Sequence, residues 1–218
     1  MNDTIIVVNP NSTAACTQAI DAAMAPLRMA GGPAIECVTM TDGPPGVESQ
    51  HDSDSVILPL CHYIHGRNND AGAFVIACFS DPGLHAARET TARPVLGIAE
   101  CAYLSAMTQG ERFGVISILE PSVKRHGRYV RQLGLAQRSA GDRAIGLGVV
   151  ELSNEDKVLQ RMIETGRALR DEDGADVLIL GCAGMARYRE RVSDALSMPV
   201  VEPSQSAVAM ALGRLRCG

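Results

Sequence analysis

Two stretches of the chain decide its fold: FVIACFSDPGLHAARETTARPVLGI at residues 74–98 and VLILGCAGMARYRERVSDALSMPVVEP at residues 177–203. Each begins with a short apolar run that ends at a cysteine. Each then continues through glycine and a helical pattern with Arg and Glu to a proline and a second apolar run. Cys78 precedes Pro94 by 16 residues, and Cys182 precedes Pro199 by 17. This match indicates an internal duplication in which the two cysteines occupy equivalent positions.

The same order of strand and helix runs through both halves of the chain. Short apolar runs, alternating or rich in β-branched residues, predict strands, and helical spacing follows each of them. The predicted strands are residues 4–8, 34–40, 74–78, 94–98, 113–118, 144–150, 177–181 and 199–202. In the first half, helical patterns cover residues 13–29, 53–69, 84–91 and 99–108. Corresponding apolar runs start at residues 5 and 113, 36 and 144, 74 and 177, and 94 and 199, with offsets of 103 to 108 residues.

Strands that alternate with helices imply parallel sheets with right-handed crossovers and helices on both faces. A closed barrel of eight such units typically needs about 250 residues, and this chain has 218. We therefore expect an α/β fold of two similar domains, each a four-stranded parallel sheet flanked by helices, related by a pseudo-twofold axis. The first domain is expected to take residues 1–99 and a C-terminal helix at 205–218 that returns to it, and the second residues 100–204. The active site is expected in the cleft between them.

Composition and charge limit the class of partner. The chain has 20 basic and 25 acidic residues, a net charge of −5 and no long run of one sign. This pattern argues against nucleic acid or a membrane surface as a partner and favours a small-molecule substrate. The chain has no stretch of 18 apolar residues, and its first residues lack the basic and apolar regions of a signal peptide. We expect a cytoplasmic protein that forms a homo-oligomer.

Seven cysteines occur, an odd number, and none has the spacing of a zinc site. A reducing compartment and no metal site are therefore expected. Cys78 and Cys182 stand at the carboxyl ends of predicted strands, where open α/β sheets bind ligands. A cysteine before a helix lies near free N–H groups, which favour its thiolate.

The residues after the two cysteines are candidates for substrate binding. The sequence SDPG (residues 80–83) comes shortly after Cys78, and AG (residues 183–184) comes directly after Cys182. These small residues let a ligand approach backbone N–H groups that could hold an oxyanion. We expect substrate contacts at Phe79, Ser80, Ala183 and Gly184.

Two acid-base groups that face one carbon from opposite sides suit the inversion of a stereocentre next to a carbonyl. One group removes the proton, and the other returns a proton to the far face. The phosphate-binding and serine-hydrolase consensus sequences are absent from the chain. A pyridoxal cofactor would need a Schiff-base lysine, and the chain has only Lys124 and Lys157, both in polar helical settings. We therefore expect a mechanism without a cofactor.

Four motifs resemble the aspartate/glutamate/hydantoin racemase superfamily, and within it the hydantoin and allantoin racemase branch. They are VVNPNST at residues 7–13, ACFSDPGL at 77–84, FGVIS at 113–117 and LGCAGM at 180–185. The resemblance covers nearly the whole chain. It implies two similar α/β domains with the active site between them and racemisation by two cysteines without a cofactor, here Cys78 and Cys182. The related arylmalonate decarboxylases keep only one of these cysteines.

The resemblance also implies that an amino-terminal loop lines the substrate pocket, here Asn9, Asn11, Ser12 and Thr13. We assign helix capping to Ser12 and the better ligand contact to Asn11. Amide and hydroxyl groups suit a neutral cyclic ureide, whose ring carbon is more acidic than the α-carbon of a zwitterionic amino acid. The loop at residues 42–49, DGPPGVES, is expected to shape the pocket for the ring substituent.

Other polar clusters fit ordinary surface roles. The five histidines are scattered, and His62 and His65 fit a solvated helix face, as does the arginine cluster at residues 186–192. Two other functions remain open from the sequence. One is a racemase or isomerase of aspartate, glutamate or a related dicarboxylate, which would need an arginine-lined pocket. The other is a non-catalytic two-lobed protein that binds a small molecule.

Overall fold

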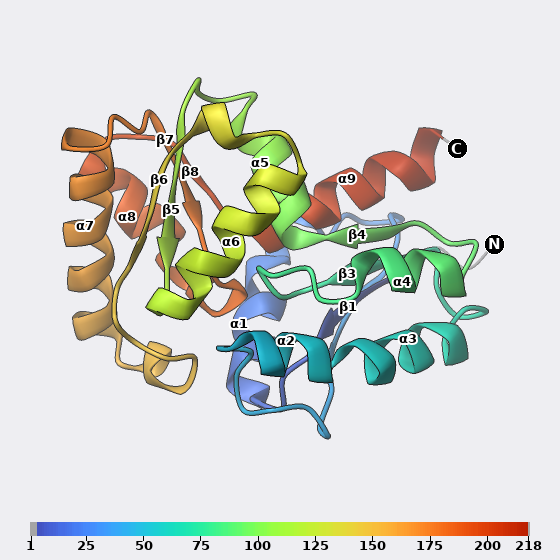
Figure 1. Cartoon of the computed structure of the whole chain (residues 1–218). Helices are drawn as coiled ribbons and strands as arrows, with labels where there is room; N and C mark the ends of the chain where they lie inside the picture. The colour runs from blue at the N-terminus through green and yellow to red at the C-terminus, as the bar shows by residue number, and fades with distance from the viewer. Residues whose placement is uncertain (1–3, 218) are drawn as a thin grey trace.

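The computed structural model describes residues 4–217, and these residues contain two four-stranded parallel sheets with helices on both faces (Figure 1). The first sheet has the order β2-β1-β3-β4 and the second the matching order β6-β5-β7-β8. The strands are β1 (Ile5–Asn9), β2 (Ile35–Thr39), β3 (Ala73–Ile76), β4 (Val95–Gly97), β5 (Phe113–Ser117), β6 (Ser139–Ala144), β7 (Val177–Leu180) and β8 (Val200–Val201). The expected fold class is confirmed.

The helices follow the strands in chain order. They are α1 (Ala14–Ala23), α2 (Gln50–Ser55), α3 (Ile57–Gly66), α4 (Leu84–Thr90), α5 (Ile98–Ala106), α6 (Glu120–Gln132), α7 (Glu155–Asp171), α8 (Arg189–Leu196) and α9 (Pro203–Cys217). The C-terminal helix α9 crosses back to pack against α5, β3 and β4 of the first half (Figure 1).

The alternation of side chains along the strands divides the apolar residues among three cores. In β1, Ile5 and Val7 join a central core, whereas Ile6 and Val8 face the core beneath α3 and α4. In β5, Val115 joins the same central core and Ile116 faces the core beneath α7 and α8. The inner faces of both sheets therefore share one core with α5 and α9, which fixes the two halves against each other.

The predicted strand at residues 144–150 is wrong in position. The observed β6 lies at Ser139–Ala144, where the polar sequence SAGDRA forms an edge strand that is half-buried along its whole length. An edge strand does not need two apolar faces. Gly146 takes the left-handed conformation (φ 73°), which ends the extended backbone. The apolar residues that follow, Ile145, Leu147 and Val149, join the outer core of the second half instead.

Two predicted helices are shorter than their patterns indicate. The pattern at 13–29 becomes α1 and a short 3₁₀ turn at Ala25–Leu27. The pattern at 53–69 becomes α2 and α3, which meet at Val56. A capping box starts α2: the Ser49 hydroxyl accepts from the Asp52 N–H, and the Asp52 carboxylate accepts from the Ser49 N–H.

The corresponding strands of the two halves start 104 to 108 residues apart, close to the spacing in the sequence. Ile35 and Ser139, which start β2 and β6, are 104 residues apart, and so are Ala73 and Val177, which start β3 and β7.

Within residues 4–217, every helix is too short or too polar to cross a bilayer.

Candidate active site

One residue separates Cys78 from the end of β3, and one residue separates Cys182 from the end of β7. The N–H of Ala77, just before Cys78, donates to the carbonyl of Val8 at 2.8 Å. The N–H of Gly181, just before Cys182, donates to the carbonyl of Ile116 at the same distance. The two cysteines therefore leave equivalent strands at equivalent points, as the duplication in the sequence implies.

The turns after the two cysteines also match. The Ser80 N–H donates to the thiol of Cys78, and the Gly184 N–H donates to the thiol of Cys182. The carbonyl of Cys78 accepts from the Asp81 N–H at 2.9 Å, and that of Cys182 accepts from the Met185 N–H at 3.0 Å. Each sulfur thus has a backbone donor two residues further along the chain, which stabilises negative charge on it.

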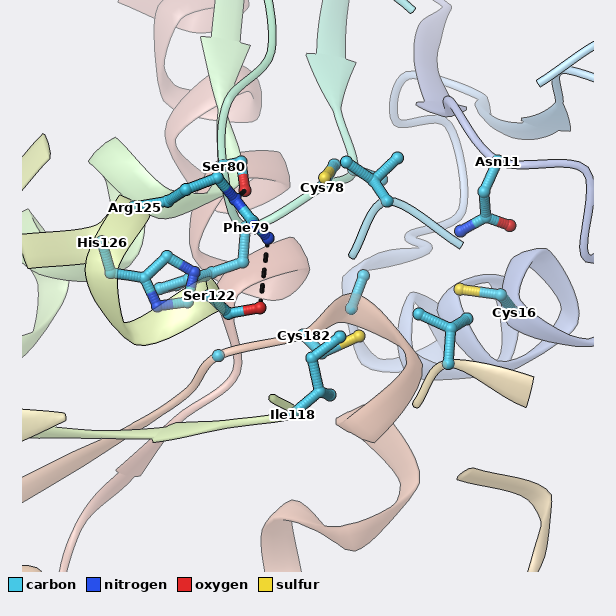
Figure 2. Close-up of a pocket in the computed structure, with 15 residues that line it drawn as sticks. Asn11, Cys16, Cys78, Phe79, Ser80, Ile118, Ser122, Arg125, His126 and Cys182 are labelled. Atoms are coloured by element: carbon cyan, nitrogen blue, oxygen red, sulfur yellow. Dashed lines mark hydrogen bonds between the residues drawn. The ribbon is translucent and has the colours of Figure 1, made fainter. Parts of the chain in front are cut away.

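Both cysteines line one narrow cavity between the two halves (Figure 2). They lie on opposite walls of it, with Asn11 and Cys16 to one side and Arg125 to the other. The lining residues are Asn11, Cys16, Val47, Ala77, Cys78, Phe79, Ser80, Ile118, Ser122, Arg125, His126, Val149, Gly181, Cys182 and Ala183.

Most of the residues expected at the site from the sequence lie in this cavity. The cavity is lined by both cysteines, Asn11, Phe79, Ser80 and Ala183. Four residues expected to line the pocket or to contact the substrate are not among its lining residues in the described part of the chain: Asn9, Ser12, Thr13 and Gly184. Gly184 instead supplies the backbone donor to Cys182.

Asn9 acts on the site through Asn11. Its side-chain amide donates to the Asn11 Oδ1 and to the Thr17 hydroxyl, both at 3.0 Å. Asn11 Oδ1 also accepts from the Thr13 N–H at 2.9 Å, and the Asn11 side chain hydrogen-bonds the Cys16 thiol. These contacts hold the Asn11 amide at the cavity wall.

The helix cap expected at Ser12 is wrong. The N-cap of α1 is Thr13, and its side chain makes no capping bond. The Ser12 N–H and the Thr13 hydroxyl instead donate to the carbonyls of Pro44 and Pro45. This part of the loop is therefore bound to the segment at residues 42–49 and not to its own helix.

Several lining residues were not singled out in the sequence. They are Cys16, Ile118, Ser122, Arg125, His126 and Val149, whereas Val47 belongs to the loop at residues 42–49 that was expected to shape the pocket. Arg125 and His126 come from α6, whose sequence EPSVKRHGRYVRQ reads as a polar surface helix. His62 and His65 are exposed, as expected.

His126 is 3% exposed and has two polar neighbours on the second sheet. Its Nδ1 lies 2.8 Å from Asp142 Oδ2 and 3.0 Å from the Ser117 hydroxyl, which donates to Asp142 Oδ1 at 2.5 Å. The His126 ring meets the Phe79 ring edge-on, with centroids 5.0 Å apart. This ring contact from His126 on α6 therefore positions Phe79, the residue next to Cys78.

Arg125 is 7% exposed and joins three segments. Its Nη1 donates to the Glu48 carbonyl at 2.8 Å, its Nη2 to the Ser122 hydroxyl at 3.1 Å, and its Nε to the Ser80 hydroxyl at 3.3 Å. These bonds link α6 to the loop at residues 42–49 and to the turn after Cys78.

The loop at residues 42–49 also contacts the second half directly. The Glu48 carboxylate accepts from the Val149 N–H at 2.7 Å. Val47 and Val149 both line the cavity, together with Ile118. These three side chains give the cavity part of its apolar wall.

Burial raises the pKa of Cys78 to about 12, although the Ser80 N–H and Arg125 act to lower it. Burial also raises the pKa of Cys182, and the neighbouring Cys16 and Cys78 raise it further. The sequence predicted the opposite direction from the nearby helix starts. Burial outweighs the backbone donors here, and α4 begins only at Leu84, six residues after Cys78.

The cavity wall carries groups for proton transfer. The thiols, once ionised, are strong bases because their pKa values are high. Clusters of three or more His, Cys, Asp or Glu suited to a metal ion do not occur in residues 4–217. A reaction that moves one proton at each of two walls is therefore within the reach of the side chains present.

Comparisons with known proteins match the chain over nearly its full length. The family described as Asp/Glu/Hydantoin racemase matches residues 5–211. A hydantoin racemase of Paenarthrobacter aurescens is 36% identical over 95% of this chain and 89% of its own length. A hydantoin racemase of Rhizobium meliloti is 37% identical over 98% of this chain and 89% of its own length. The structure of an allantoin racemase from Klebsiella pneumoniae superimposes with a TM-score of 0.90 at 33% identity, covering 98% of this chain and 87% of that one.

Proposed function

The chain belongs to the Asp/Glu/hydantoin racemase family and is a racemase, and we propose that it inverts the stereocentre of a cyclic ureide of the hydantoin or allantoin class by proton transfer between Cys78 and Cys182. As a racemase, it is not the non-catalytic binding protein that the sequence left open. One observation carries the proposal: the two cysteines that the duplication makes equivalent line the same cavity from opposite walls (Figure 2).

The proposed reaction moves one proton at each wall. The thiolate of one cysteine takes the hydrogen from the ring carbon between the carbonyl and the ureido nitrogen, and the electron pair moves onto the carbonyl oxygen as an enolate. The thiol of the other cysteine then gives its proton to the opposite face of the carbon. The first cysteine ends as a thiol and the second as a thiolate, and proton exchange with solvent restores the starting form.

The side chains around the cysteines support a neutral ring more than an amino acid. Arg125 is the one arginine among the described lining residues, and these include no carboxylate. Aspartate or glutamate would bring two carboxylates and an ammonium group, which need several cations and an anionic acceptor. A cyclic ureide needs only amide and hydroxyl partners, which Asn11, Ser80 and Ser122 offer.

A panel of single enantiomers tests the substrate class. We expect optical rotation to decay for allantoin or 5-substituted hydantoins and to stay constant for aspartate and glutamate. Decay with aspartate or glutamate alone would establish the dicarboxylate function instead. Cyclic ureides also racemise slowly without enzyme, so the matched blank is the double variant Cys78→Ser/Cys182→Ser at the same protein concentration.

The rate should depend on pH through the thiolate. Because the pKa of Cys78 is raised to about 12 and that of Cys182 is also raised, both thiols are mostly protonated at neutral pH. The thiolate fraction below its pKa grows tenfold for each pH unit. We therefore expect kcat/KM to rise about tenfold per unit between about pH 7 and pH 9, measured by polarimetry after subtraction of the blank. A flat or falling profile over this interval would show that the free enzyme does not need to lose a thiol proton.

A further inference from the structure

The two cysteine turns match in their backbone but differ in the charged groups around them. The Ser80 and Gly184 N–H donors are equivalent. The guanidinium of Arg125, which lines the same cavity, acts to lower the pKa of Cys78. The groups acting most strongly on Cys182 include no cation; they are the Cys16 and Cys78 thiols and the Glu48 carboxylate, which all disfavour its thiolate.

Arg125 is a buried cation without a carboxylate partner among the ion pairs of residues 4–217. Its three hydrogen bonds go to two hydroxyls and a backbone carbonyl. The nearby carboxylates have other partners: that of Glu48 accepts from Val149, and that of Asp52 accepts from Ser49. A buried charge of this kind is costly unless an anion compensates it. Within the cavity, such an anion must come from a thiol or from the substrate.

The bonds of Arg125 place it beside Cys78. Its Nε donates to the hydroxyl of Ser80, whose N–H holds the sulfur of Cys78. In Figure 2 the guanidinium of Arg125 lies beside Ser80 and Ser122 and faces the cavity that Cys78 lines. The helix that carries Arg125 belongs to the second half of the chain, whereas Cys78 belongs to the first.

We propose that Arg125 directs the first ionisation to Cys78, so that the form of the substrate-free enzyme that carries one thiolate has it on Cys78 and keeps Cys182 as the thiol. The inference rests on the proposed two-cysteine function and adds a positioning residue that the duplication does not supply. The backbone donors at the two cysteine turns are alike and do not distinguish the thiols, whereas Arg125 acts to lower the pKa of Cys78.

Other groups around Cys78 act in the opposite direction. Asp81, on the same turn, raises the pKa of Cys78, as does the Cys16 thiol. Burial raises the pKa of Asp81 itself to about 7, and its carboxylate accepts from the N–H groups of Ala99 and Glu100. Arg128 acts on Arg125 as a like charge. Asp81 acts on Cys78 more strongly than Arg125 does, and Arg125 is the cation among the groups that act on this thiol, so its removal is a sensitive test.

Thiol alkylation tests this assignment without any substrate. Iodoacetamide reacts with thiolates, and peptide mass spectrometry gives the rate at Cys78 and at Cys182 separately. In the unmodified protein we expect Cys78 to react about tenfold faster than Cys182 near pH 8. Arg125→Met should slow Cys78 by about tenfold, move the midpoint of its pH profile upward and change Cys182 by less than about threefold. Arg125→Lys, which keeps the charge, should recover most of the rate.

The control is Arg128→Met, one turn along the same helix. Arg128 bonds Gln50 on an exposed surface and does not line the cysteine cavity, so this variant should leave both rates unchanged. Equal alkylation of the two cysteines before mutation, or an unchanged ratio in Arg125→Met, would overturn the inference. Because no substrate is used, this outcome is separate from a failure of the racemase assay.

Discussion

Replacing Cys78 or Cys182 by serine lowers the rate of racemisation by about 10³-fold, because the hydroxyl of serine is a far weaker acid than a thiol and its alkoxide does not form near neutral pH. Either substitution removes one of the two proton-transfer groups that line the cavity. The measurement is the decay of optical rotation of a single enantiomer of the ureide that the substrate panel identifies.

Each serine variant should keep one partial reaction. The remaining thiol can still remove the hydrogen on its own side and return a proton to the same face. We therefore expect each variant to exchange the ring hydrogen of one enantiomer with heavy water without inversion, and the two variants to favour opposite enantiomers. Cys37→Ser is the matched control, because Cys37 is a partly buried cysteine on β2 that does not line the cavity. Unchanged exchange of both enantiomers in both variants would contradict the assigned roles.

Gly181→Ala should have the second largest effect. A Cβ on Gly181 would lie 2.7 Å from the carbonyl oxygen of Ile116 and 3.0 Å from Val115 Cγ1. The backbone oxygen cannot move away without breaking the bond that it accepts from the Gly181 N–H. The strand end and Cys182 must therefore shift. We expect a loss of about 1–3 kcal/mol in the free energy of unfolding and about a 10²-fold loss in kcat.

Chemical denaturation and polarimetry measure these two effects, and Gly213→Ala provides the comparison. Gly213 lies in α9, and a Cβ there would meet no atom within 4 Å. Alanine in that helix should stabilise the fold by about 0.5–1 kcal/mol and leave the activity unchanged. If Gly181→Ala behaved like Gly213→Ala, the close approach at the end of β7 would not position Cys182.

The sequence predicted the sheets best where the strands are buried on both faces. The runs around β1, β3, β5 and β7 are continuous and apolar, so their positions were correct to within a few residues. The edge strand β6 was missed because its residues are polar and half-buried, whereas the apolar residues after it pack in a loop. The pattern of apolar residues along a sequence indicates which positions are buried. An edge strand is only partly buried, so this pattern does not reveal it.

The two cysteines of the site could be inferred because they occupy equivalent positions in the two repeats. The repeat pattern does not single out Arg125 or His126. They lie next to each other on an amphipathic helix and become cavity residues only because α6 packs against the turn after Cys78 and the loop at residues 42–49. Those contacts join segments that are 45 and 77 residues apart in the chain. A single sequence contains no signal for contacts of this kind.

The direction of the thiol pKa values could not be read from the sequence either. A strand end before small residues indicates backbone donors, and the structure has them at Ser80 and Gly184. The larger effect comes from burial of the thiols in a cavity that Val47, Ile118 and Val149 also line, from three separate loops. Desolvation depends on how those loops meet, which is a property of the fold.

Deuterium incorporation during the first turnovers tests the two-cysteine mechanism most directly. A single enantiomer of the ureide is incubated with the enzyme in heavy water, and substrate and product are separated and analysed by mass spectrometry. With separate thiols on the two faces, the inverted product carries deuterium from its first appearance, while the recovered substrate keeps its hydrogen. Equal deuterium in the recovered substrate and the product from the start would mean that one group serves both faces, and would contradict the mechanism.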